Sequence, residues 1–183
     1  HPENALESAG RLPGLCPGAG HLVHMPAHIY QRVGDYEAAA GSNEAAVAAD
    51  QVYLRNHPEP GIYGMMYYSH NLHFLAVAHA MQGRTKDALA AADSLAANVQ
   101  PHVREMPMLE GFLIMPTLIM VRCQRYGDLL NMAPPPRDLT LCQAMWRFGR
   151  GMALAARNDV ADARRQRDAL QSILKKTPTT MPW

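Results

Sequence analysis

Residues 21–50 read HLVHMPAHIYQRVGDYEAAAGSNEAAVAAD, and this stretch decides the fold class of the chain. Apolar residues recur at three- and four-residue spacing on both sides of Gly34. That spacing is typical of amphipathic helices, and a glycine between two such segments indicates a turn. We therefore expect two helices joined near Gly34.

The same helix–turn–helix pattern recurs along the chain. Aligning the alanine-rich segments places four residues at the turn between two helices, namely Gly34, Gly83, Gln124 and Asn158. Five positions later come Ala39, Ala88, Leu129 and Ala163, a slot where small residues let antiparallel helices approach closely. Strand-like alternation is nearly absent, so we expect an all-α protein.

The repeat predicts a single domain, residues 1–183, built as an α-solenoid of antiparallel helix hairpins. About four units are expected, at residues 20–52, 68–100, 109–135 and 143–175, with an insertion at 53–67. The insertion is rich in Pro, Gly and Tyr, which favours a surface loop or an extra helix. Residues 1–17 fit only the second half of a unit, because Ala5 and Leu12 precede Ala39 and Ala46 by 34 positions. The chain is therefore expected to start inside a repeat.

The best-matching unit resembles the tetratricopeptide repeat, a two-helix unit of about 34 residues. The residues that carry the resemblance are Tyr30, Gly34, Asp35, Tyr36, Ala39 and Ala46. Over nearly its whole length the chain is also similar to a bacterial group of tetratricopeptide proteins with the motifs HxxHMPxHIYxRxGxY and HNLHFLxxAxxMxGR. Here these motifs read HLVHMPAHIYQRVGDY and HNLHFLAVAHAMQGR. The resemblance implies the fold but no particular reaction, and members of the group generally carry a further His-rich helix upstream.

Two histidine clusters occupy equivalent positions in neighbouring units. His21, His24 and His28 lie thirteen, ten and six residues before Gly34, and His70 and His73 lie thirteen and ten residues before Gly83. In tetratricopeptide arrays this part of the first helix lines the concave surface, so the resemblance implies a shared groove. Neutral imidazoles suit transition metals, which makes a divalent ion such as Zn or Cu the candidate cofactor. The candidate metal ligands are His21, His24, His28, His70 and His73.

Pro26 leaves the geometry of the first cluster open. A proline inside a helix removes a hydrogen bond and kinks the axis, whereas at the first turn it is tolerated. If the helix starts near Pro26, His21 and His24 belong to its entry segment and the three histidines need not share one stripe. The alternatives to a metal site are groove histidines bonded to backbone or tyrosine, and pH-sensitive contacts to an acidic partner.

Other residues are candidates for the groove or for packing. The candidate groove and ligand-binding residues are Tyr30, Arg32, Asn71 and Glu110, although Arg32 and Glu110 also fit solvated or helix-end charges. His79 stands where Tyr30 stands in its own unit, which favours a packed side chain. Asp35 follows Gly34 and is expected to cap the second helix.

Composition and motifs narrow the function. With 17 basic and 16 acidic residues and no basic run, neither nucleic acid nor an anionic membrane is the expected partner, and no apolar stretch is long enough to span a bilayer. Three cysteines leave the redox compartment open, and the resemblance slightly favours a secreted or periplasmic location. No familiar catalytic motif is present.

These observations favour a non-enzymatic interaction scaffold with a His-lined groove over an enzyme. Its partner would be another protein or further copies of the chain, in a head-to-tail oligomer or filament. The alternative is a metal-binding protein or a metal-dependent enzyme that uses the groove histidines.

Overall fold

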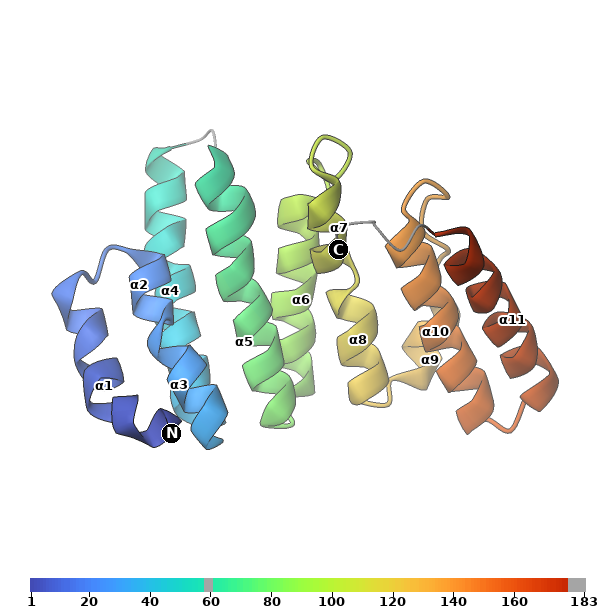
Figure 1. Cartoon of the computed structure of the whole chain (residues 1–183), viewed down its shortest axis with the longest axis horizontal. Coiled ribbons are helices and arrows are strands. Elements are labelled where there is room, and N and C mark those ends of the chain that lie inside the picture. Colours follow the sequence, from blue (N-terminus) through green and yellow to red (C-terminus); the bar gives the residue numbers. More distant parts are fainter. Residues whose placement is uncertain (58–60, 178–183) are drawn as a thin grey trace. The chain divides into compact units, whose positions relative to one another are not determined.

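The structure, a computed structural model, describes residues 1–57 and 61–177 (Figure 1). Helices and turns make up this part of the chain, which contains no strand, as an all-α fold requires. The chain divides into two compact units, His1–Asn98 and Val99–Trp183. Among the described residues, no helix has the length and apolar character needed to cross a membrane.

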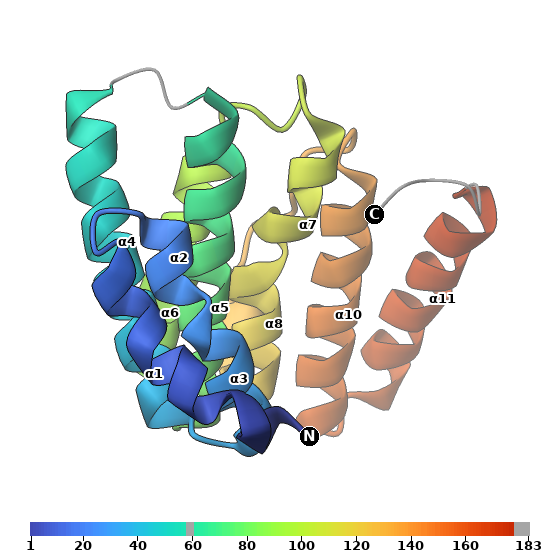
Figure 2. The same cartoon turned by 60° about the vertical axis from the view of Figure 1, so that its left-hand side comes forward.

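The first unit holds the two histidine clusters. Its α-helices are α1 (Leu6–Leu15), α2 (Gly20–His24), α3 (Pro26–Val33), α4 (Tyr36–Asn56), α5 (Ser69–Met81) and α6 (Thr85–Val99). A 3-10 turn η1 (Pro2–Ala5) leads into α1, and a π-helical segment η2 (Tyr63–Tyr68) leads into α5. Helices α2, α3 and α5 all pack against α4, and α1 lies against α2 and α3 (Figure 2). Helix α4 is therefore the support on which both histidine-bearing segments rest.

The second unit contains shorter helices followed by one long pair. Its elements are η3 (Pro107–Leu109), α7 (Glu110–Leu113), α8 (Met115–Arg122), α9 (Tyr126–Asn131), α10 (Thr140–Ala156) and α11 (Val160–Lys176). Helix α10 packs against α7, α8, α9 and α11. A side chain at Gly149 would meet Leu129 and Thr117 at 2.8 and 2.9 Å, so glycine allows α10 to lie close to its neighbours.

The four turns predicted from the sequence are present and share one backbone conformation. Gly34, Gly83, Gln124 and Asn158 all have positive φ, at 83°, 75°, 55° and 62°. In each turn the next residue's N–H bonds the carbonyl five residues back, at 2.8–2.9 Å, as in Asp35 to Tyr30 and Arg125 to Met120. A left-handed residue with this bond satisfies carbonyls left free at a helix end. The second helix then starts at once, and Asp35 caps α4 by accepting from the Ala38 N–H at 3.0 Å.

The chain breaks the first helix of two pairs at the same place, just before a proline. Helix α3 starts at Pro26 after α2 has ended at His24, and α8 starts at Met115, with Pro116 in its first turn. Proline lacks an N–H and fits the first turn of a helix, where no intrahelical partner is lost.

Most of the stretch 53–67, expected to be a surface loop or an extra helix, belongs to the ends of the neighbouring helical segments α4 and η2. Helix α4 continues to Asn56, and η2 starts at Tyr63 and runs directly into α5. The predicted loop or extra helix also includes residues 58–60, which lie outside the described residues. The extra length extends the two helices that carry the site.

The core of the first unit is built from small side chains. Ala27, Ala39, Ala40 and Ala78 are fully or almost fully buried and form one cluster. Alanine at these positions lets α3, α4 and α5 approach closely, and the rings of Tyr30 and Phe74 pack against the cluster. Tyr30, a candidate groove residue, is thus a packing residue that covers the core.

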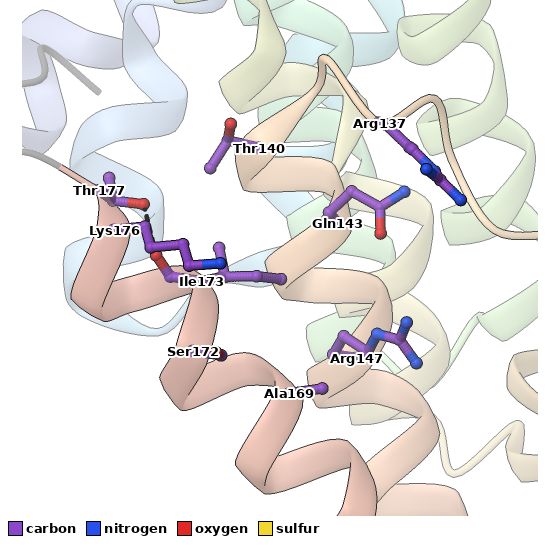
Figure 3. Close-up of a pocket in the computed structure, with 9 residues that line it drawn as sticks. All are labelled: Arg137, Thr140, Gln143, Arg147, Ala169, Ser172, Ile173, Lys176 and Thr177. Carbon is purple, nitrogen blue, oxygen red and sulfur yellow. Dashed lines mark hydrogen bonds between the residues drawn. The ribbon is translucent and has the colours of Figure 1, made fainter.

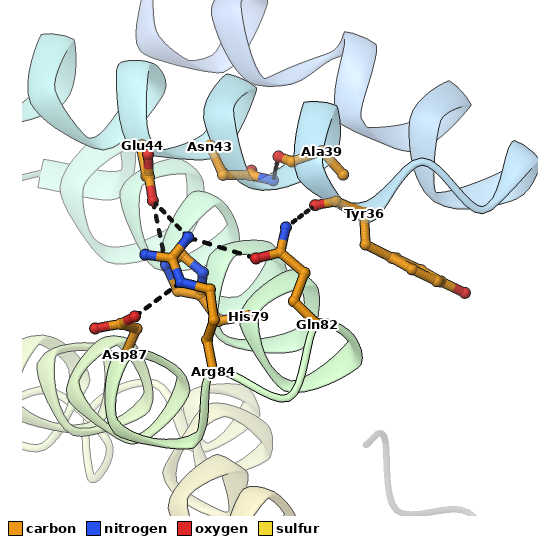
Figure 4. A network of polar contacts seen from close by, with 8 residues as sticks. All are labelled: Tyr36, Ala39, Asn43, Glu44, His79, Gln82, Arg84 and Asp87. Atoms are coloured by element: carbon orange, nitrogen blue, oxygen red, sulfur yellow. Dashed lines mark hydrogen bonds and ion pairs between the residues drawn. The ribbon is translucent and has the colours of Figure 1, made fainter.

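A polar network joins α4, α5 and the start of α6 (Figure 4). His79 is 4% exposed, as the prediction of a packed side chain requires, and its Nε2 lies 3.5 Å from Glu44. Arg84 contacts the same carboxylate at 3.5 Å and also Asp87 at 2.8 Å. Gln82 completes the network by donating to the backbone carbonyl of Tyr36 at 2.6 Å. These contacts fix α5 on α4 at the end remote from η2.

Candidate functional site

Four histidines from three helices converge in the first unit. The Nε2 of His24 on α2 lies 3.0 Å from the Nε2 of His28 on α3 and 3.1 Å from that of His70 on α5. His21 joins them, because its ring, with those of His24 and His70, offers nitrogens that all lie within 4.8 Å of one another. Neither His28 nor His73 is in that group of three. The ring of His73 lies 6.0 Å from that of Phe74, and its charge contributes to the lowered pKa of His70.

The break before Pro26 does not separate the histidines. Met25, between the two helices, keeps helical dihedral angles of −51° and −35°. The backbone therefore continues in helical sense, and His28 stays on the same side as His24, four residues earlier. Their rings meet edge to face at a centroid distance of 4.8 Å. The question that Pro26 leaves open in the sequence is settled in favour of a shared face.

Asn43 on α4 determines the orientation of the central histidine. The Asn43 amide nitrogen donates to the Ala39 carbonyl at 2.7 Å, so its Oδ1 faces His24 as an acceptor. The Nδ1 of His24 lies 2.6 Å from that oxygen and must carry the proton. The Nε2 of neutral His24 is then the atom with the free lone pair, and it points at His28 and His70. A histidine whose second nitrogen donates to an oxygen is the usual arrangement of a metal ligand.

Burial keeps these histidines neutral. Desolvation is the largest cause that lowers the pKa of His24 to about 4, followed in the same direction by the charges of neighbouring histidines. Burial and the nearby histidines also lower the pKa of His70 to about 4. The pKa values of His28 and His73 are lowered as well, in each case mainly by burial. At neutral pH His24, His28 and His70 therefore offer uncharged imidazoles, the form that binds metal ions.

A buried carboxylate holds the elements around the cluster together. Asp50 on α4 is fully buried and accepts hydrogen bonds from the Tyr63 hydroxyl and the Asn71 amide, both at 2.7 Å. Burial raises the pKa of Asp50, and burial together with Asp50 raises that of Tyr63 to about 12. Asp50 also packs against the backbone of Gly20, where a Cβ would stand only 2.0 Å from its Oδ1. One side chain thus positions the start of α2, the π-helical segment and α5.

Aromatic rings enclose the histidines. Phe74 contacts the rings of His24, His28 and His70 at centroid distances of 4.5–4.7 Å. Tyr67 meets His21 at 4.6 Å and is 43% exposed. The cluster therefore has an apolar wall at Phe74 and reaches the surface beside Tyr67.

The arrangement fits a cation. Imidazole nitrogens bound at about 2.0–2.1 Å in a tetrahedron would lie about 3.3 Å apart, close to the 3.0 and 3.1 Å that separate the Nε2 of His24 from those of His28 and His70. The single lone pair on the Nε2 of His24 faces two nitrogens and can accept only one good hydrogen bond. The buried Nδ1 of His21 has no hydrogen-bond partner within the described part of the chain. A bound ion would be coordinated by these lone pairs simultaneously.

The other candidate groove residues lie in different surroundings. Arg32 is exposed on α3, one turn after His28, and its charge contributes to the lowered pKa of that histidine. Asn71 is fully buried on Asp50 and does not line an open groove. Glu110 belongs to the second unit, is 7% exposed, and accepts a hydrogen bond from the Cys142 N–H at 2.9 Å. It is a buried cap for the first turn of α10, where three N–H groups lack helical partners.

Several residues of the site carry no signal in the sequence. Asn43 and Asp50 stand on an alanine-rich helix, and Tyr67 and Phe74 resemble ordinary packing residues. The polar pair offers one indication: Asn43 and Asp50 are seven positions apart, so they share the face of α4 that also carries Ala39 and Ala46. A polar residue on an apolar helix face requires a buried partner.

A second concave feature lies in the second unit, between α10 and α11 (Figure 3). It encloses about 640 Å³, and its polar lining residues are Arg137, Thr140, Gln143, Arg147, Ser172, Lys176 and Thr177. Gln143 donates to the Pro135 carbonyl and Arg147 to Gln166, so two of these side chains already have partners.

Comparison with protein-family models, curated proteins and solved structures finds no match to this chain.

Proposed function

We propose that the first unit binds one divalent transition metal ion through His21, His24, His28 and His70. The observation that carries the proposal is the meeting of three Nε2 atoms at 3.0 and 3.1 Å around a His24 ring held by Asn43. Histidines that merely filled a core would not need a fixed tautomer with its lone pair turned toward other imidazoles. Zn and Cu are the preferred ions because all the ligands are imidazoles.

The coordinating histidines come from segments far apart in the sequence. His70 lies 46 residues from His24, and both rest on α4. An ion would therefore tie α5 to α2 and α3, and its binding free energy would stabilise the first unit. Binding of Zn or Cu is accordingly expected to raise the melting temperature.

Metal analysis of the purified, untreated protein is the direct test. We expect about one Zn or Cu per chain by elemental analysis. Chelation should remove the ion and lower the melting temperature, because an ion that binds only the native state stabilises it by about 2.7 kcal/mol at a hundredfold excess over Kd. A chain that carries no stoichiometric metal, and whose melting temperature is unchanged by added Zn or Cu, would rule the proposal out.

Substitutions distinguish this site from incidental binding by surface histidines. His28→Ala and His70→Ala should each weaken binding by at least tenfold, since each removes a ligand. His57→Ala is the matched control: His57 is exposed and stacks on Tyr53, away from the four-histidine cluster. Circular dichroism of the metal-free variants shows whether folding is preserved. Equal losses in all three variants would assign the ion to the surface.

A second proposed function is an interaction scaffold of tetratricopeptide type. The four turns with the same left-handed residue and the same hydrogen bond support a repeated helix pair. Leu6 and Leu15 on α1 remain 38% and 78% exposed, which provides an apolar contact for another copy or for a partner protein. Light scattering with size-exclusion tests self-association: we expect oligomers that are lost in Leu15→Gln. A strictly monomeric species at high concentration would exclude the head-to-tail assembly.

A further inference from the structure

The charge of the proposed metal site is not balanced by its surroundings. All four proposed ligands are histidines, and imidazole binds a metal ion in its neutral form, so a bound divalent ion would keep its full charge. Asp50, the carboxylate that interacts electrostatically with His21, already accepts from Tyr63 and Asn71 with its two oxygens. An ion at this site would therefore attract an anion from solution.

Arg32 follows the site on α3 and carries a positive charge, as the proposed metal ion would. It follows His28 by four residues on α3, which places both side chains on one helix face. Its charge is also among the causes that lower the pKa of His28. In the described part of the chain Arg32 makes no ion pair, and its side chain is exposed.

The cluster is accessible on the side where an anion would arrive. His21, His28 and His70 are only partly buried, and Tyr67 at the rim is 43% exposed. Phe74 closes the cluster with an apolar ring against three of the imidazoles. A small ligand can therefore approach the ion past His28 and Arg32.

We infer that this site takes a small oxyanion ligand, a carboxylate or a phosphoryl group, bound between the metal ion and Arg32. The inference rests on the proposed metal site. One oxygen of the ligand binds the ion, which expands to five ligands as zinc sites can, and another oxygen accepts from the guanidinium. The planar guanidinium matches carboxylate and phosphate geometry, a match that Lys at this position would lack.

Cobalt(II) is the probe, because its visible spectrum reports the number and kind of its ligands. The protein is loaded with Co²⁺ and titrated with acetate and, separately, with methylphosphonate at constant ionic strength. We expect either or both anions to change the absorption bands saturably, and the stronger of the two identifies the class of ligand. Arg32→Gln should weaken the apparent anion affinity by about three- to tenfold, as expected for one exposed charge-assisted contact.

Arg11→Gln is the control, since it removes the same charge by the same substitution on α1, where Arg11 pairs with Glu7. Its anion affinity should match that of the unsubstituted protein. If Co²⁺ binds but neither anion changes the spectrum, or if Arg32→Gln and Arg11→Gln behave alike, the inference is overturned while the metal site stands. If Co²⁺ does not bind at all, the proposed function fails and the inference fails with it.

Discussion

The Oδ1 of Asn43 lies 2.6 Å from the Nδ1 of His24, across 19 positions of sequence and in a fully buried environment. This contact fixes the tautomer of the central histidine, because the Asn43 amide nitrogen is already committed to the Ala39 carbonyl. It leaves the lone pair on the Nε2 of this buried histidine aimed at two other imidazoles, as the proposed metal site requires. The candidate site thus depends on a residue that does not itself face the ion.

Replacing Asn43 should therefore weaken metal binding without removing a ligand. Asn43→Leu is expected to lower Zn affinity by about 10- to 100-fold, as measured by competition with a chromophoric chelator. It should also cost about 1–3 kcal/mol in the free energy of unfolding of the metal-free protein, because the His24 N–H loses its acceptor. Asn43→Asp keeps an acceptor oxygen and should bind Zn better than Asn43→Leu. Equal affinities in the two variants would contradict a tautomer-fixing role.

The stability of the metal-free protein should depend on pH through the histidine cluster. The folded-state pKa values of His24 and His70 are about 4, below the ordinary value of 6.5, so the unfolded chain binds more protons between these limits. The contribution of these histidines to the free energy of unfolding is therefore complete above about pH 6.5 and is lost as the pH drops toward 4. For the buried His24 alone this loss amounts to about 3 kcal/mol.

Urea denaturation of the metal-free protein at pH 7.5, 6 and 5 measures this dependence. The raised pKa of Asp50 acts in the opposite sense, because its folded form binds the proton more readily, so the net slope is smaller than the histidines alone would give. His70→Gln should reduce the slope further. An unfolding free energy that is the same at pH 7.5 and pH 5, with a pH dependence that His70→Gln leaves unchanged, would show that the histidines are not held neutral by burial.

The contact between Gly20 and Asp50 predicts a sharp steric effect. In Gly20→Ala the new Cβ would stand 2.0 Å from Asp50 Oδ1 and 2.8 Å from the Ala46 carbonyl oxygen. Helix α2 would have to move away from α4, at a cost of about 3 kcal/mol, and would carry His21 and His24 with it. Gly18→Ala is the control, since nothing lies within 4 Å of its Cβ position. Thermal denaturation and Zn affinity of the two variants should differ clearly; similar values would place α2 elsewhere.

The left-handed turns of the second unit predict a stabilising substitution. Gln124 has φ of 55°, a conformation that costs a side chain of this kind about 1 kcal/mol and glycine little. Gln124→Gly should therefore raise the free energy of unfolding by about 0.5–1 kcal/mol. Gln171→Gly, at an exposed position inside α11, should lower it by a similar amount. Guanidinium denaturation measures the free energy of unfolding of both variants. A decrease in both would contradict the left-handed conformation of Gln124.

The helix–turn–helix pattern was visible in the sequence because it depends on local chemistry. Apolar spacing gives the helices, and a residue that tolerates positive φ ends each first helix, as at Gly34 and Asn158. The burial of His79 also followed from its position relative to Gly83. Contacts among a few neighbouring residues are enough to determine these features.

The candidate site was predicted only in part. The spacing of the histidines indicated which of them share a face: the Nε2 of His24 lies close to those of His28 and His70, and His21 forms a group of three with His24 and His70. That these histidines are metal ligands stays a prediction. His73 was expected among the ligands because of its position in the repeat. It lies about one turn after His70 on α5, and only His70 belongs to the group of three with His21 and His24. Glu110 was expected at a groove, whereas it is buried against Cys142, 32 positions away.

By itself, therefore, the sequence determined the all-helical fold, its four turns and the histidines available for a site. Only the tertiary structure decided which nitrogens meet, which nitrogen of His24 carries the proton and which side chains enforce this. The physical reason is range. Turns and helices are set by contacts within a few residues, whereas Asn43, Asp50 and Phe74 contact His24, Asn71 and His24 across 19, 21 and 50 positions. Such contacts exist only once α2, α3 and α5 have packed on α4.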